Sequence, residues 1–216
     1  MHLPSLRQEE AEAFSERMEE VMNVSVLSCT ENPLDIVSIS AGTCYGKPTI
    51  SHKRVETCVF ADHLSVIEHA TISFKIDGIS RACLAQLTRH RHASFCVESQ
   101  RYNRYDLDGD EWYVMPPEIR KSCPIEFDEH MTACAEAYRK ALISGMKPED
   151  ARYLLPEATK TNLVVTMKAR NLFHLFSMRL DRAAQWEIRE LVAEMKKQAS
   201  LVNDQWRRLI EMYGGK

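Results

Sequence analysis

The sequence predicts one domain that combines amphipathic helices with a few short strands. Its 216 residues fit a single domain spanning residues 1–216, because one core commonly extends to about 200 to 250 residues before a chain divides. Hydrophobic residues make up 44% of the chain and charged residues 27%, as is typical of a folded globular protein. Two hydrophobic periodicities then define the elements.

Apolar residues recur at three- and four-residue spacing in several stretches, which predicts helices that bury one face. These helices cover residues 8–22, 125–143, 169–179 and 185–213. A further stretch, residues 79–88, is apolar on most of its surface and predicts a buried helix. Pro148, followed by two acidic residues, indicates the start of a short helix, since proline and negative charge both suit a first turn.

Alternating β-branched and polar residues predict strands at residues 24–30, 70–76 and 161–167,. Asn32-Pro33 and Asp77-Gly78 are turn signals that should end the first two. Residues 36–45 are expected to form a further strand or a loop.

The overall composition excludes several classes of protein. A formal net charge of -3 argues against a globally basic nucleic-acid binder,. The seven cysteines contain no Cys-x-x-Cys pair, which disfavours a disulfide framework or a zinc site. Neither a signal peptide nor an apolar run of about 20 residues is evident. We therefore expect a cytoplasmic protein with reduced thiols and no membrane partner.

The stretch from Arg89 to Tyr102 concentrates polar chemistry directly after the buried helix. It reads RHRHASFCVESQRY, with three arginines and no lysine. A run of charges is usually a solvated face, but such faces mix lysine with glutamate. Here serine, glutamine and aromatic residues separate the guanidinium groups, which favours planar recognition of a phosphate beside a stacked ring.

The motif Arg89-His90-Arg91, seven residues, Ser99 and then Gln100-Arg101-Tyr102 resembles the signature of the flavin-dependent thymidylate synthases. Three other blocks are similar to that family in compatible order, and together the four blocks span about residues 62–189. The matching positions outside the signature are His63, Ser65, Glu68 and His69 before a strand, Gln86, Arg152 ahead of Leu155-Pro156, Arg170, Arg179 and the run Ala184-Gln185-Trp186-Glu187-Ile188.

This resemblance implies an α+β fold, with helices packed around a small antiparallel sheet. It also implies a homotetramer whose active sites are shared between subunits. The implied reaction is the reductive methylation of dUMP to dTMP with 5,10-methylenetetrahydrofolate as carbon donor. FAD reduced by NADPH would carry the electrons, and no protein nucleophile would be needed.

The resemblance also assigns residues to the two ligands. The implied dUMP contacts are Gln86, Ser99, Gln100, Arg101, Arg152 and Arg179, with Ser99 and Arg179 nearest the chemistry. The implied FAD contacts are His63, Ser65, Arg89, His90, Arg91, Glu98, Arg170 and His174. Two positions depart from the family pattern, since His174 stands where an asparagine is usual and Ala183 where many members carry a histidine.

The implied nucleotide contacts make chemical sense. Arg101, Arg152 and Ser99 can hold a doubly charged phosphate by charge-assisted hydrogen bonds. The amide of Gln86 can pair with a uracil edge. A guanidinium from Arg179 near the ring carbonyl would stabilise negative charge as hydride reaches C6.

Other interpretations remain open from the residues alone. The arginines and tyrosine could bind RNA or single-stranded DNA, and Arg152 could be an ordinary surface arginine. His90, His92 and Cys96 could ligate a metal, although no fourth ligand is marked nearby. His69 suits a structural, hydrogen-bonded role. Neither the nucleic-acid nor the metal interpretation accounts for Gln86, Arg152 and Arg179.

Overall fold

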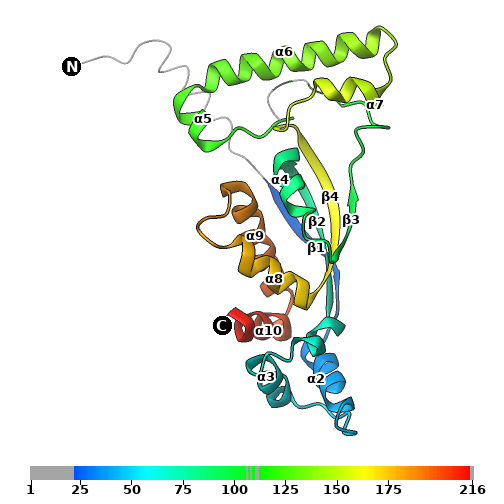
Figure 1. The fold of residues 1–216 in the computed structure, drawn as a ribbon, viewed down its shortest axis with the longest axis vertical. Coiled ribbons are helices and arrows are strands. Elements are labelled where there is room, and N and C mark those ends of the chain that lie inside the picture. Colours follow the sequence, from blue (N-terminus) through cyan, green and yellow to red (C-terminus); the bar gives the residue numbers. More distant parts are fainter. Residues whose placement is uncertain (1–21, 106, 108, 110–111, 215–216) are drawn as a thin grey trace, which may run out of the picture. The chain divides into compact units, whose positions relative to one another are not determined.

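The computed structural model describes residues 22–105, 107, 109 and 112–214 (Figure 1). The helix predicted over residues 8–22 lies outside this part of the chain apart from Met22. The described residues belong to two compact units. The sheet unit comprises residues 23–77, 85–96 and 163–214, and the helical unit comprises Met22, 78–84 and the described part of 97–162.

Four antiparallel strands form the sheet in the order β1-β2-β4-β3. Their bounds are β1 Asn23–Cys29, β2 Thr71–Ser80, β3 Ala93–Val97 and β4 Lys160–Lys168. In the β1–β2 pair, Asn23 lies opposite Asp77 and Cys29 opposite Ile72, with a register irregularity between Val26 and Ser28. The three predicted strands are confirmed, and β3 is an additional strand inside the arginine-rich stretch.

Asp77-Gly78 was predicted to be a turn, and that prediction is wrong. Strand β2 continues through both residues to Ser80. Gly78 has a φ of 81°, which glycine adopts without steric penalty,. Its N–H donates to Asn162 Oδ1 at 3.1 Å, so the strand keeps a hydrogen-bond partner at this point.

Among the helices of the sheet unit, α8, α9 and α10 lie on one side of the strands in Figure 1, and α2 and α3 lie toward the lower end of the strands. Their bounds are α2 Pro33–Thr43, α3 His52–Phe60, η1 Leu64–His69, α8 Ala169–Arg179, α9 Trp186–Val202 and α10 Asp204–Gly214; α4 Arg81–Leu87 follows β2. Helix α9 packs against β1. The core between these elements includes fully buried Phe74, Phe173 and Trp206. Helix α8 has the predicted bounds.

Helix α2 replaces the strand or loop predicted for residues 36–45. Pro33 occupies the first turn, and Leu34, Val37 and Ala41 recur at helical spacing and are buried. The side chain of Gln205 on α10 caps the helix, because its Oε1 accepts hydrogen bonds from the N–H groups of Leu34 and Asp35 at 2.9 and 3.4 Å. A contact from a residue so distant in the sequence could not be predicted from the local pattern.

The single helix predicted over residues 185–213 is in fact two helices. Asn203 interrupts it in an extended conformation. Its side-chain oxygen accepts a hydrogen bond from Trp206 N at 2.9 Å, and its amide nitrogen donates to Glu31 O at 2.8 Å. Asn203 therefore begins α10 as an N-cap and turns the chain so that Trp206 enters the core.

The helical unit is built on the 20-residue helix α6, Pro124–Ile143, which confirms the helix predicted over 125–143. Its other elements are α5 Pro117–Ser122, α7 Pro148–Ala151 and η2 Arg152–Leu154. Trp112, Tyr113, Met131 and Tyr138 form much of its own hydrophobic core.

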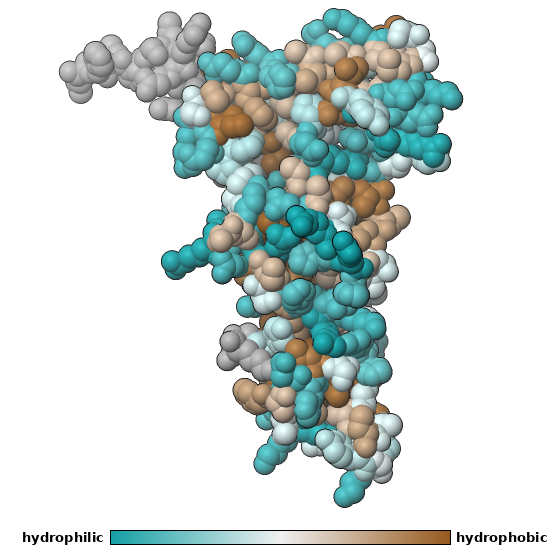
Figure 2. Space-filling model, viewed as in Figure 1, coloured by the Kyte–Doolittle hydropathy of each residue, from teal (hydrophilic) through white to brown (hydrophobic). Residues whose placement is uncertain are grey.

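No helix in the described part of the chain is long and apolar enough to span a membrane. On the face shown in Figure 2, hydrophobic residues occur in small groups among hydrophilic ones.

Candidate functional site

In the helical unit, Arg101 and Arg152 both bond to Glu149. Arg101 Nε donates to Glu149 Oε2 at 2.8 Å, and Arg152 Nε donates to the Glu149 backbone oxygen at 3.0 Å. Each guanidinium also lies over the ring of the next residue, 5.2 Å from the Tyr102 centroid and 5.9 Å from that of Tyr153. Arg101 lowers the pKa of Glu149 through this hydrogen bond. One residue thus gathers two cations whose side chains still reach solvent.

Ser99 and Arg101 are joined by a tight turn. Arg101 N donates to Ser99 Oγ at 3.2 Å, and Asn103 N donates to Ser99 O at 3.1 Å. Within the described residues, Ser99 Oγ makes no hydrogen bond to a histidine or a carboxylate that could remove its proton. Its hydroxyl hydrogen is therefore available to donate to an anion. Gln100 lies half-buried in the same turn.

Glu98 belongs to the helical unit as well. Its Oε2 accepts a hydrogen bond from Asn162 Nδ2 at 3.0 Å, and its N–H donates to Asn162 O at 2.9 Å. Arg81 binds the Glu98 backbone oxygen at 2.9 Å and Tyr105 Oη at 2.7 Å. The Glu98 carboxylate is therefore held in place by an amide rather than by a cation.

In the sheet unit, Arg179 at the end of α8 reaches back to the arginine-rich stretch. Its Nε donates to His90 Nε2 at 3.0 Å and its Nη2 donates to Gln86 O at 3.3 Å. Because a guanidinium can only donate, His90 Nε2 accepts, and the neutral ring carries its proton on Nδ1. Burial, Arg179 and His174 together lower the pKa of His90 from 6.5 to about 4. His90 is thus a neutral acceptor that orients a cation.

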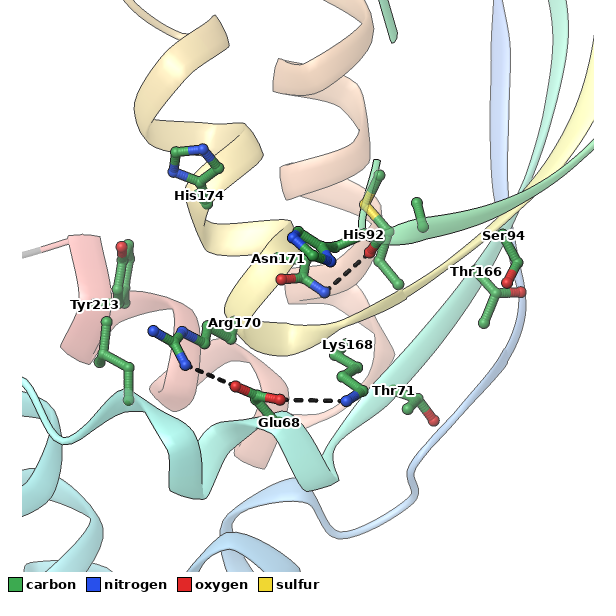
Figure 3. A pocket seen from close by; sticks show the side chains of 13 residues that line it. Glu68, Thr71, His92, Ser94, Thr166, Lys168, Arg170, Asn171, His174 and Tyr213 are labelled. Carbon is green, nitrogen blue, oxygen red and sulfur yellow. Dashed lines mark hydrogen bonds and ion pairs between the residues drawn. The ribbon is translucent and has the colours of Figure 1, made fainter. Parts of the chain in front are cut away.

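Arg179 and His90 line the smaller of two adjoining pockets. The smaller, of about 510 Å³, is lined by Arg89, His90, Arg91, His92, Met167, Asn171, His174, Met178 and Arg179. The larger, of about 750 Å³ (Figure 3), is lined by Leu64, Glu68, Thr71, His92, Ala93, Ser94, Thr166, Met167, Lys168, Arg170, Asn171, His174 and Tyr213. Four of these residues line both, so the pockets adjoin.

Glu68 organises the larger pocket. Its two oxygens accept from Arg170 Nη1 at 2.7 Å and from Lys168 Nζ at 3.2 Å (Figure 3). These hydrogen bonds, that of Arg170 first, lower the pKa of Glu68. Asn171 Nδ2 donates to His92 O at 2.9 Å and so ties α8 to the residues before β3.

The two pockets are strongly cationic. Their described lining includes five guanidinium or ammonium groups, from Arg89, Arg91, Lys168, Arg170 and Arg179, against the single carboxylate of Glu68. A ligand that fills them would have to carry negative charge.

The comparisons with known proteins agree with this chemistry. Residues 25–202 match the family model described as thymidylate synthase complementing protein. The chain is 40% identical over 187 residues to the flavin-dependent thymidylate synthase of Geobacter sulfurreducens, covering 81% of this chain and 80% of that protein. It is 35% identical over 198 residues to that of Pyrococcus furiosus, with coverage of 85% and 81%. The chain belongs to the flavin-dependent thymidylate synthase family.

Solved structures place the fold in the same flavin-dependent thymidylate synthase family. Thymidylate synthase X of Helicobacter pylori, crystallised with FAD and dUMP, superposes with a TM-score of 0.72 at 25% identity, covering 89% of this chain and 99% of that one. A UMP/dUMP methylase from Streptomyces cacaoi, at 20% identity and a TM-score of 0.76, shares the fold. The family, the α+β fold class and the enzyme class predicted from the sequence are confirmed.

The residues expected from this family fall in both units. Gln86, Arg89, His90, Arg91, Arg170, His174 and Arg179 lie in the sheet unit, and Ser99, Gln100, Arg101 and Arg152 lie in the helical unit with Glu98. His63 and Ser65 are exposed at the start of η1. His63 lines a third pocket, whereas the next residue, Leu64, lines the larger of the first two.

Several lining residues were not singled out from the sequence. Lys168 and Asn171 flank Arg170, and their proximity to it was a usable signal. Tyr213 stacks on Phe173, with ring centroids 4.7 Å apart, and lines the larger pocket from α10. Tyr213 lies beyond residue 202, where the match to the family model ends, and no sequence motif indicated that it would line the pocket.

Proposed function

We propose that this member of the flavin-dependent thymidylate synthase family methylates dUMP to dTMP with 5,10-methylenetetrahydrofolate as carbon donor, using FAD that NADPH reduces. The observation that carries this is the pair of adjoining cationic pockets, the smaller of which is lined by hydrogen-bonded Arg179 and His90. They offer room and positive charge for a flavin dinucleotide, whose pyrophosphate is anionic.

We assign FAD to the contacts His63, Ser65, Arg89, His90, Arg91, Glu98, Arg170 and His174. Five of these residues fit this group because they line the two pockets, where arginines suit a pyrophosphate: Arg89, His90, Arg91, Arg170 and His174,. His63 lines a third pocket, and Glu98 lies in the helical unit. When bound, FAD would supply the hydride of the reaction. Arg170 is already oriented by Glu68, and Lys168 adds a second cation beside it.

We assign dUMP to Gln86, Ser99, Gln100, Arg101, Arg152 and Arg179. Arg101, Arg152 and the Ser99 hydroxyl suit the phosphate, because all three present donors and Glu149 holds the two guanidiniums near one residue. Arg179 suits the uracil ring, where a fixed cation stabilises developing negative charge. Since His90 is neutral, it orients this guanidinium without repelling it.

Ser99 and Arg179 are the residues that we place nearest the reacting atoms. The absence of a proton acceptor for Ser99 among the described residues supports a substrate contact rather than a nucleophile. We also propose that residues 1–216 act as one domain in a cytoplasmic homotetramer with shared active sites. Neither nucleic acid nor a membrane is a proposed partner.

The metal and nucleic-acid alternatives receive less support. Within the described residues, no group of three or more histidine, cysteine or acidic side chains could hold a metal ion. His90 Nε2, one of the candidate ligands, already accepts a hydrogen bond from Arg179. The cations of the sheet unit line pockets, whereas a single strand is bound by an extended basic groove.

The experiment that tests this function follows the flavin directly. Purified protein should be yellow, NADPH should bleach it anaerobically, and 5,10-methylenetetrahydrofolate with dUMP should restore the colour while dTMP forms. Arg179→Ala should remove dTMP formation, whereas the exposed matched control Arg182→Ala should retain it. Colourless protein that takes up no FAD on reconstitution would overturn the proposal.

A further inference from the structure

A third pocket of about 420 Å³ lies beside helix α3 in the sheet unit. It is lined by Tyr45, Ser51, Lys53, Arg54, Thr57, Cys58, Ala61 and His63. None of these residues lines the two cationic pockets described above, although His63 is also among the contacts assigned to FAD. The third pocket is nevertheless close to the larger of the two. His63 lines the third pocket, and the next residue, Leu64, lines the larger proposed flavin pocket.

The polar groups of this pocket are suited to an anion. Lys53 and Arg54 are cations, the three hydroxyl groups and the imidazole can donate hydrogen bonds, and no carboxylate is among the lining residues,. Lys53 is exposed and forms no ion pair with any described residue. The acid nearest in sequence, Glu56, lies within 3.7 Å of Arg208 instead. The positive charge of Lys53 is therefore not neutralised locally.

Arg54 is held rigidly at the edge of the pocket. Its Nη1 donates to Ser38 O at 3.2 Å and Thr49 O at 2.9 Å, and its Nη2 donates to Thr49 Oγ1 at 3.4 Å. This packing requires Gly42, because a Cβ atom there would collide with Lys47 O and Arg54 Nη1. A guanidinium fixed in this way loses little further freedom when an anion binds.

The backbone also fixes His63. After α3, Asp62 adopts a φ of 61°, which is uncommon outside glycine,. His63 N donates to Cys58 O at 2.8 Å and Asp62 N to Val59 O at 3.2 Å, so the helix ends in a Schellman-type turn,. This turn places His63 directly after α3, and His63 lines the pocket together with Cys58 and Ala61.

We propose that this third pocket binds the anionic end of a cosubstrate of the reaction, a flat ring bearing a phosphate or carboxylates. The inference deepens the proposed function and rests on it. The volume suits one ring and its charged group rather than a whole dinucleotide. Two cosubstrates carry such an end, NADPH with its 2′-phosphoadenosine and methylenetetrahydrofolate with its benzoylglutamate. The position beside Leu64 leaves the remainder of either molecule close to the proposed flavin pocket.

Lys53→Glu tests the pocket, with Lys47→Glu as the matched control, because Lys47 is an exposed lysine nearby in sequence that lines none of the three pockets. In the FAD-loaded protein, flavin absorbance and the KM for dUMP should be unchanged in both variants. Lys53→Glu should raise the KM for one cosubstrate about tenfold, equivalent to about 1.4 kcal/mol, with little change in kcat.

The two sources are distinguished by paired ligands. If the phosphate is bound, Lys53→Glu raises the KM for NADPH in anaerobic flavin reduction and leaves that for NADH unchanged. If carboxylates are bound, the KM for methylenetetrahydrofolate rises, and rises more for the triglutamate than for the monoglutamate.

Calorimetric titration of the same proteins with NADP⁺ and with tetrahydrofolate triglutamate measures binding without turnover. Weakened binding of either probe by Lys53→Glu would support the third pocket as a cosubstrate site even if the protein formed no dTMP. A failure of the proposed function can therefore be distinguished from a failure of this inference. Unchanged affinity for both probes and unchanged KM for both cosubstrates would overturn the inference.

Discussion

Acidification is expected to destabilise the folded protein through His90. Its pKa is about 4 in the folded chain against 6.5 in an unperturbed one, first because burial disfavours the charged ring and then because Arg179 and His174 lie near it. The unfolded chain therefore binds a proton on this ring that the folded chain does not, between about pH 6.5 and 4. The contribution of His90 to the free energy of unfolding is therefore fully present above about pH 6.5 and is lost as the pH falls toward about 4,.

The size of the effect follows from the same values. The interval from 6.5 to about 4, at about 1.36 kcal/mol per pH unit, corresponds to about 3 kcal/mol. His90 is only partly buried, and water screens part of the interaction, so we expect a contribution of about 1 to 2 kcal/mol to the free energy of unfolding.

The assay is urea unfolding of the flavin-free protein at pH 7, 6 and 5. His90→Gln keeps a hydrogen-bond acceptor for Arg179 Nε but cannot be protonated, and the carboxylates that titrate in both proteins cancel in the difference. Between pH 7 and 5 the wild type should lose about 1 kcal/mol more than the variant. His130→Gln, at an exposed position on α6, is the control and should behave as wild type. Parallel pH profiles for wild type and His90→Gln, or an NMR titration of His90 with a midpoint of 6 or above, would refute the reasoning.

Three further perturbations address the site and its scaffold. Ser99→Ala should weaken dTMP formation without abolishing it, because the serine is assigned to substrate binding; complete loss together with a covalent nucleotide adduct on Ser99 in the wild type would contradict that role. Tyr213→Ala should lower FAD affinity several-fold while Tyr213→Phe retains it, since only the ring stacks on Phe173. Fluorescence titration with FAD measures both variants, and an affinity of Tyr213→Ala equal to that of the wild type would exclude a contact between Tyr213 and FAD. Asn203→Ala should lower the free energy of unfolding by about 1 kcal/mol through loss of the α10 cap, as measured by urea denaturation,; an unchanged midpoint would show that the cap is dispensable.

Local patterns predicted the elements whose determinants are local. The alternation of residues 161–167 and the spacing of 169–179 each lie within one element, and both predictions are confirmed. Local patterns gave wrong predictions where a residue distant in the sequence determines the start or the end of an element. Helix α2 is capped by Gln205, and the α9–α10 break depends on Asn203 bonding to Glu31, so neither could be derived from the segment itself.

In the candidate site, too, residues within local motifs could be predicted from the sequence, and residues placed by tertiary contacts could not. Arg170 and Arg179 lie on one helix within recognisable motifs, whereas Tyr213 reaches the pocket only because α10 folds back against α9. The neutral state of His90 is likewise a tertiary property. A histidine next to two arginines in sequence gives no indication of its partner, and the lowered pKa depends on burial and on Arg179.

In each unit, one glutamate holds two of the cations that line or border the proposed ligand sites. In the helical unit the Glu149 carboxylate pairs with Arg101, and the Glu149 backbone oxygen accepts a hydrogen bond from Arg152. In the sheet unit the Glu68 carboxylate pairs with both Arg170 and Lys168. Because these side chains are solvent-accessible, such ion pairs are individually weak, and a doubly charged phosphate can compete for the same donors. The two glutamates therefore limit the freedom of long arginine and lysine side chains without blocking them. This arrangement lowers the entropy lost when an anion binds, and it leaves net positive charge in the pockets to attract one.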